Sequence, residues 1–69
     1  MTNLKNLIPE IRDNGELVET YLVDESQLIS NAGDAELYLY NDIGYEIIVW
    51  NDRAEEHEEG EETISKIEL

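Results

Sequence analysis

Residues 35–50 constrain the fold of this chain more than any other segment. Two runs of apolar and aromatic residues, 35–40 and 45–50, are joined by the four residues NDIG, which favour a turn. β-branched and aromatic side chains are common in strands, so the segment predicts an antiparallel hairpin. An isolated hairpin is only marginally stable in water, and the rest of the chain must therefore cover it.

The N-terminal segment predicts a helix that can supply this cover. Its apolar residues follow the spacing i, i+3, i+4 and i+7 of an amphipathic helix: Leu4, Leu7, Ile8 and Ile11. With Asn6 as the N-cap, Pro9 falls in the first turn, where a helix does not need its missing N–H. Asn14-Gly15 is expected to end the helix.

Two further segments are expected to extend the hairpin into a sheet. Residues 16–23 alternate with period two, which indicates a strand, whereas residues 63–69 fit a strand and a helical turn about equally well. We favour a strand for 63–69. Residues 24–33 are rich in turn-forming residues, with Leu28 and Ile29 as anchors for a helical turn or a brief strand. The predicted fold is α+β, with a short N-terminal helix packed on a small antiparallel sheet of three to four strands with a central hairpin.

The length of 69 residues allows one domain, and we expect residues 1–69 to form a single small acidic domain with an acidic loop at 52–62. The lack of cysteine excludes disulfides and thiolate zinc sites, so apolar packing must carry the fold. No apolar run approaches the roughly 18 residues that span a bilayer, and the N-terminus lacks the features of a signal peptide. We therefore expect a cytoplasmic protein, located in the bacterial host cell if a phage encodes it.

Negative charge is the most unusual property of the composition. Eighteen acidic and four basic side chains give a formal net charge of −14, whereas a small soluble domain typically carries about 2 to 8 charges. In residues 52–62, seven acidic side chains and one arginine leave −6, and in the first fifty residues ten acidic and two basic side chains leave −8. The excess is therefore spread over the folded part of the chain and is not confined to a loop.

This charge limits the class of partner. Nucleic acids and anionic membranes are bound through lysine and arginine, and the chain has few of these: Lys5, Arg12, Arg53 and Lys66. We therefore expect no direct binding of nucleic acid and no binding of membranes. The complementary partner is a basic protein surface.

No pattern in the sequence indicates catalysis or a cofactor. The single histidine, His57, lies between Glu56 and Glu58 and is expected to be an exposed residue of a charged loop. Phosphate-binding glycine loops, HExxH motifs and the spacing of calcium loops are all missing. We expect a non-enzymatic protein without a cofactor or a specific metal site, and weak, non-selective binding of divalent cations to residues 52–62 stays open.

The acidic residues have spacings that resemble a row of phosphates. Asp34 and Glu36 have the i, i+2 relation that places two side chains about 6.6 Å apart on one strand face. The acidic residues expected to bind a partner form two groups: Asp34, Glu36, Asp42 and Glu46 on the hairpin, and Glu55, Glu56, Glu58, Glu59, Glu61 and Glu62 in the loop. The alternative is a solvated polar face, which is the usual meaning of a charge run.

Both faces of the predicted hairpin are partly apolar. Alternation places Tyr38 and Tyr40 on one strand face and Leu37 and Leu39 on the other. Tyr38, Tyr40 and Trp50 therefore either pack in the core or form an exposed aromatic patch that contributes to partner binding. Both alternatives are consistent with the pattern.

In its small size, lack of cysteine, opening helix over 4–11, hairpin and distributed carboxylates, the chain resembles the small acidic inhibitors encoded by bacteriophages and mobile elements. These include DNA-mimic anti-restriction and anti-CRISPR proteins. The resemblance covers the whole chain as a type, and it implies a non-enzymatic inhibitor whose target is a nucleic-acid-binding protein such as a Cas effector or a restriction enzyme. The alternative is a small protein-interaction module or homodimeric subunit that pairs through the hairpin edge and whose charge serves solubility.

Overall fold

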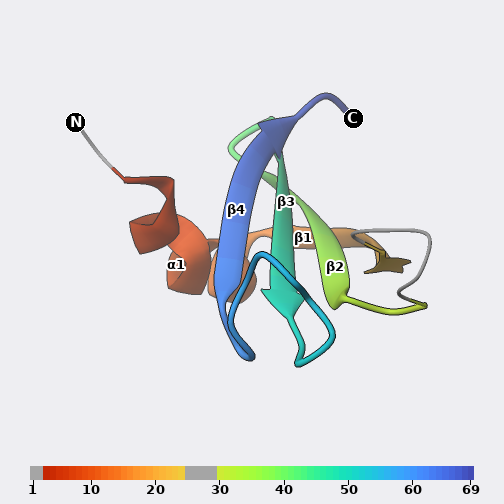
Figure 1. The fold of residues 1–69 in the computed structure, drawn as a ribbon. Helices are drawn as coiled ribbons and strands as arrows, with labels where there is room; N and C mark the ends of the chain where they lie inside the picture. The colour runs from red at the N-terminus through yellow and green to blue at the C-terminus, as the bar shows by residue number, and fades with distance from the viewer. Residues whose placement is uncertain (1–2, 25–29) are drawn as a thin grey trace.

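The computed structural model describes residues 3–24 and 30–69, which form one helical segment and one sheet (Figure 1). A 3-10 turn over Leu4–Leu7 leads into the helix, and four strands follow: α1 (Ile8–Asn14), β1 (Glu16–Val23), β2 (Gly33–Tyr40), β3 (Ile43–Trp50) and β4 (Glu62–Ile67). The strands are antiparallel and pair in the order β1-β2-β3-β4. The predicted α+β fold, with a short N-terminal helix on an antiparallel sheet, is confirmed.

Helix α1 covers one face of the sheet with the apolar stripe that its sequence predicts. Ile8 and Ile11 are buried, and Leu4 and Leu7 of the preceding turn pack against the same core. Pro9 lies in the first turn of α1, where its lack of an N–H leaves no helical carbonyl without a donor. This part of the prediction is confirmed.

The two ends of the helical segment are determined by Asn3 and Gly15. The Asn3 side chain accepts a hydrogen bond of 3.0 Å from the Lys5 N–H, so the predicted N-cap at Asn6 was wrong and Asn6 lies inside the 3-10 turn. Gly15 ends the helix as expected, although its backbone is extended (φ −76°, ψ 163°). A Cβ atom at this position would lie 2.5 Å from the Ile11 carbonyl oxygen, and only glycine permits so close an approach.

Strands β2 and β3 form the central hairpin with a tighter turn than the sequence predicted. Tyr40 pairs with Ile43, so the turn consists of Asn41 and Asp42 alone. Both residues have positive φ, 51° and 63°, which is the conformation of a type I′ turn. The predicted four-residue link was therefore wrong at its second half, because Ile43 and Gly44 belong to β3.

The core lies between α1 and the face of the sheet that α1 covers. Its buried residues come from the helix and the two central strands: Ile8, Ile11, Tyr38, Tyr45 and Ile47. Ile11 and Ile47 are fully buried, and each such side chain contributes about 1.5 to 3 kcal/mol to folding. On the opposite face Ala35 and Trp50 are also buried, so both faces of the central hairpin are covered in part.

Strand β1 lies at one edge of the sheet and contributes little to this core. All of its residues are exposed except Val23, which is half-buried. The register with β2 shifts between Leu17 and Glu19, which makes Val18 an extra residue in a β-bulge. The bulge places Leu17 on the α1 face, whereas uninterrupted alternation would place it on the same face as Glu19 and Tyr21.

The C-terminal segment forms β4, so the strand favoured over a helical turn is confirmed. The connection between β3 and β4 is a loop as expected, but Glu62 is the first residue of β4 and the loop ends at Glu61. The expected turn or strand at Leu28 and Ile29 lies outside the described residues.

Candidate functional site

The acidic loop, expected at 52–62, consists of residues 51–61 in the structure, and it folds back onto the end of the sheet. The Trp50 N–H donates to the Glu61 carbonyl at 2.8 Å, and the Gly60 N–H donates to the Trp50 carbonyl at 2.7 Å. The Asn51 N–H donates to the Ala32 carbonyl at 2.9 Å, which attaches the loop to the start of β2. Gly60 has a φ of 85°, a left-handed conformation that glycine adopts without strain. Backbone hydrogen bonds therefore hold both ends of the loop.

His57 lies against the sheet, and the expectation of an exposed loop residue was wrong. Its ring stacks on Trp50 with centroids 4.1 Å apart and an angle of 14° between the planes. Its Nδ1 atom lies 2.5 Å from Oε2 of Glu61, and this hydrogen bond holds the pKa of the Glu61 carboxyl below its usual value. The sequence shows the charged neighbours of His57, but it does not show that the folded loop places the His57 ring on the indole of Trp50.

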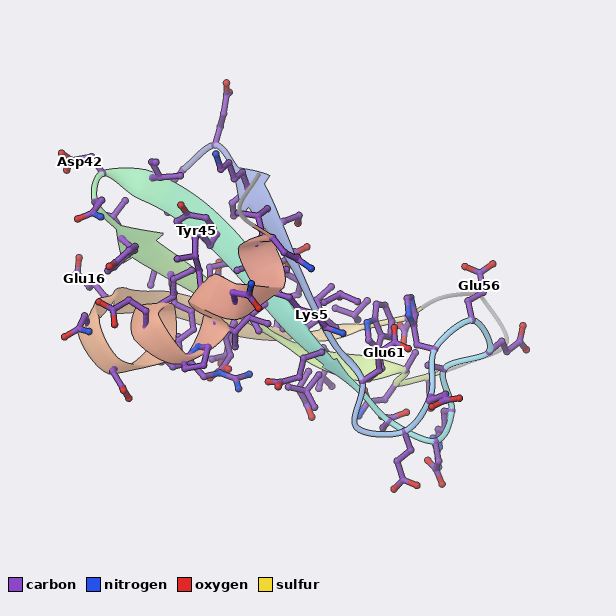
Figure 2. All side chains as sticks on the ribbon, turned by 90° about the vertical axis from the view of Figure 1, so that its left-hand side faces the viewer. Lys5, Glu16, Asp42, Tyr45, Glu56 and Glu61 are labelled. Carbon is purple, nitrogen blue, oxygen red and sulfur yellow. The ribbon has the colours of Figure 1, made fainter. Side chains whose placement is uncertain are left out.

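The exposed carboxylates of the acidic loop gather at one end of the molecule. We call the following exposed residues the acidic tip: Asp52, Glu55, Glu56, Glu58 and Glu59. Figure 2 shows Glu56 at this end and Glu16 and Asp42 at the other. Glu61 and Glu62, which were expected in the same group, are half-buried and lie outside the acidic tip.

Arg12 of α1 bridges two of the carboxylates that were expected to bind a partner. Its guanidinium lies 3.5 Å from Oε1 of Glu36 on β2 and also forms an ion pair with Glu62 on β4. The Tyr38 hydroxyl donates to Oε2 of Glu36 at 3.3 Å. Burial, followed by the charge of Glu36, raises the pKa of Tyr38. Glu36 and Glu62 thus attach the helix to the sheet, and the single charge of Arg12 balances half of their combined charge.

The acidic residues of the hairpin do not share one surface. Asp34, Glu36 and Tyr38 are at every second position of β2 and therefore share one strand face. Asp34 and Glu36 both point to the α1 face with Tyr38, so they share a face as their spacing predicted. Glu46 points to the opposite face, and Asp42 lies in the hairpin turn. Of these four acidic residues, Asp34 and Asp42 are exposed, and they lie at opposite ends of β2. The hairpin group is therefore not a single array.

Tyr38 and Trp50 are buried, and the alternative of an exposed aromatic patch was wrong. Each retains 7% exposure, and they lie on opposite faces of the hairpin. Helix α1 covers Tyr38, and the acidic loop places His57 over Trp50. Tyr40 is half-buried and donates to Oε1 of Glu10 at 3.1 Å, a hydrogen bond that raises the pKa of Tyr40. These aromatic residues stabilise the fold and do not present a joint binding surface.

A second surface, the exposed apolar side chains of β1, was missed by sequence reasoning. Leu17 and Val18 are 51% exposed, and Leu22 is 61% exposed. Within the described part of the chain β1 pairs with β2 alone, so its outer edge is open. The sequence of residues 16–23 could have indicated this exposed edge. It contains apolar residues at positions of both strand faces and none of the lysines or prolines that protect natural edge strands.

Within residues 3–24 and 30–69, no group of three or more histidine, cysteine or acidic side chains is arranged to hold a metal ion. In the same residues, no helix is long and apolar enough to cross a membrane. Comparisons with protein-family models, with curated proteins and with solved structures find no match. The molecule is a small acidic α+β domain whose acidic loop is held by hydrogen bonds at both ends and whose edge strand β1 has an open outer side within the described residues.

Proposed function

We propose that this protein binds the basic surface of a nucleic-acid-binding protein through its acidic tip and thereby excludes nucleic acid from that surface. The observation that carries the proposal is the exposure of five carboxylates on a loop whose ends are held by backbone hydrogen bonds and whose middle is anchored by His57. The protein acts as a non-enzymatic inhibitor, in the cytoplasm, and a Cas effector or a restriction enzyme represents the class of target.

An ordered loop is better suited to this role than a mobile acidic tail. Like charges repel each other and destabilise a compact state, so gathering them at one end lowers stability. In return, a loop that is already ordered loses less conformational entropy when it binds. The charge of −14 also attracts a basic partner over long range and accelerates association.

Burial narrows the contact surface. Glu36, Glu61 and Glu62 are half-buried, so the proposed contact consists of the exposed residues of the acidic tip, with Asp34 and Asp42 as more distant contributors. With Tyr38 and Trp50 buried, the contact depends mainly on charge. Binding is therefore expected to weaken steeply with salt.

The proposal is tested by immobilising the chain, passing a bacterial lysate over it and eluting with a salt gradient. We expect a nucleic-acid-binding protein to elute at moderate salt and to be displaced by duplex DNA at low salt. Captured proteins that duplex DNA does not displace would contradict competition with nucleic acid.

A small protein-interaction module, in which acidity serves solubility, is the second candidate function. The observation that favours it is the open outer edge of β1 with the exposed side chains of Leu17 and Leu22. In that case substitutions in the acidic tip leave the affinity for the partner unchanged, and substitutions on β1 abolish binding.

A further inference from the structure

We infer that the outer edge of β1 binds an extended, basic segment of a partner protein, which adds to the sheet as a fifth strand. This inference concerns a surface other than the acidic tip and does not depend on the function proposed for it. Strand addition of this kind takes its affinity from backbone hydrogen bonds and its specificity from alternate side chains.

The outer edge of β1 can pair with an added strand. β1 has eight residues and pairs, among the described residues, with β2 alone. A strand presents about half of its backbone N–H and C=O groups to each side, so the outer side of β1 offers a row of such groups, which is regular over residues 19–23, beyond the bulge at Val18. Leu17 and Leu22 lie on the α1 face of this strand and remain 51% and 61% exposed. An added strand would bury both side chains.

The surface beside this edge is hollowed where β1 and β2 meet. A hollow of about 360 Å³ lies across β1 and β2 and is lined by these residues: Thr20, Tyr21, Leu22, Asp34, Ala35 and Glu36. Thr20 pairs with Glu36 and Leu22 pairs with Asp34, so these four side chains share the α1 face. The hollow therefore combines an apolar side chain with two carboxylates, of which Asp34 is exposed.

The charge of β1 and β2 favours a basic occupant. Strands β1 and β2 contain four acidic residues and no lysine or arginine: Glu16, Glu19, Asp34 and Glu36. Neighbouring strands lie about 4.8 Å apart, so the Asp34 backbone on β2 is about 9.6 Å from an added strand. A lysine side chain of about 6 Å on that strand extends over β1 and brings its charge to within about 4 Å of the Asp34 residue. Glu19 offers a second carboxylate on the other face. A segment that mixes basic and apolar side chains satisfies both faces.

A second copy of this chain does not satisfy the same edge. Pairing β1 with β1 would bring Glu16 and Glu19 of two chains into one sheet, each chain with a charge of −14 and neither strand with a basic residue. Like charges on neighbouring strands destabilise the pairing. Charge complementarity therefore favours a basic segment over self-association.

The inference is tested with a short synthetic peptide that repeats two lysines and two valines, which places both residue types on each face of an added strand. The control peptide has the same charge but carries proline at alternate valine positions, which prevents strand pairing. We expect the lysine–valine peptide to bind at least about tenfold more tightly than the control and to slow amide hydrogen exchange in β1. Equal affinity of the two peptides, or binding without protection of β1, would show unspecific attraction and overturn the inference.

Matched variants of the chain locate the binding site. Leu22→Lys places a charge on the open edge, and Ile43→Lys makes the same change at an exposed position beside the hairpin turn. We expect Leu22→Lys to weaken peptide binding by about tenfold and Ile43→Lys by less than about threefold. Asp34→Asn leaves the edge intact and is expected to weaken binding about threefold, which provides a second test if Leu22→Lys disturbs folding. Equal effects of the two lysine variants, or no effect of Asp34→Asn, would contradict the site.

Three further measurements separate this inference from the alternatives. A threonine–valine peptide that binds as tightly as the lysine–valine peptide would refute the basic character of the partner. Sedimentation that reveals a dimer dissociated by Leu22→Lys would assign the edge to a second copy instead. Neutralising Glu55, Glu58 and Glu59 removes only general attraction, so it should weaken peptide binding less than Leu22→Lys does.

Discussion

The His57 ring stacks on Trp50 with centroids 4.1 Å apart, while its Nδ1 atom contacts Glu61 at 2.5 Å. Trp50 is the last residue of β3, and Glu61 directly precedes β4. A single side chain in the middle of the acidic loop thus contacts both ends of the loop. This arrangement holds mutually repelling carboxylates in a compact conformation.

Replacing His57 is expected to destabilise the loop and the fold together. His57→Ala removes both contacts and should lower the free energy of unfolding by about 1 kcal/mol, the typical contribution of an aromatic pair. His57→Phe keeps the stack on Trp50 and should lower the free energy of unfolding by less than half as much as His57→Ala. Urea denaturation followed by tryptophan fluorescence measures both. Equal destabilisation by the two substitutions would assign the effect to the Glu61 contact instead of the stack.

Arg12 is expected to stabilise the fold more than an exposed arginine does. Arg12→Met leaves Glu36 and Glu62 without their shared counter-ion and should lower the free energy of unfolding by about 1 to 2 kcal/mol. Arg53→Met is the matched control, because Arg53 is exposed and donates to Ser30, and it should change stability by less than about 0.5 kcal/mol. If denaturant unfolding gives the same loss for both variants, the Arg12 bridge contributes only general charge balance.

The lowered pKa of Glu61 predicts a specific dependence of stability on acid. The unfolded carboxyl takes up its proton at a higher pH than the folded one, so the contact with His57 contributes stability above the ordinary glutamate pKa, and this contribution is lost as pH falls through the lowered folded value. We expect the urea midpoint of Glu61→Gln to fall less between about pH 6 and about pH 3 than that of the unmodified chain. Parallel midpoint curves for the two proteins would refute this role of Glu61.

The hairpin turn offers a stabilising substitution. Asp42 has a φ of 63° in a type I′ turn, a conformation that glycine adopts more readily than aspartate. Asp42→Gly should raise the free energy of unfolding by about 0.5 to 1 kcal/mol. Asp42→Asn removes the same charge and keeps a side chain, so the difference between the two variants isolates the backbone effect. A lower thermal midpoint for Asp42→Gly than for Asp42→Asn would contradict the turn assignment.

The parts of the fold that sequence reasoning predicted correctly depend on local patterns. The spacing of Leu4, Leu7, Ile8 and Ile11 identified the helix and its buried face. Alternation identified the strands and placed Tyr38 and Tyr40 on one face of β2. The extra residue in β1 and the exact length of the hairpin turn depend on register between strands, which periodicity alone does not determine.

The candidate site was less predictable, because the same residues acquire different roles through distant contacts. Glu36 and Glu62 are 26 positions apart and both pair with Arg12, and neither pairing leaves a signal in the local sequence. Alternation placed Trp50 on a face of β3 but did not reveal that His57 covers it. The edge of β1 is exposed because the described residues contain no fifth strand beside it, which composition does not show.

The proposed role of the acidic tip is tested most directly by the salt dependence of binding to the captured partner. The test variant carries Glu55→Gln, Glu58→Gln and Glu59→Gln. The control variant neutralises three exposed carboxylates outside the tip and outside β1, with Glu10→Gln, Asp13→Asn and Glu68→Gln. Both variants lose the same charge, so general electrostatic attraction affects them equally.

We predict that the test variant binds the partner about tenfold more weakly at low salt and shows a flatter decline of affinity with rising salt, while the control variant stays within about threefold of the unmodified chain. An unchanged affinity and salt slope for the test variant, or equal losses for both variants, would contradict the acidic tip as the binding surface.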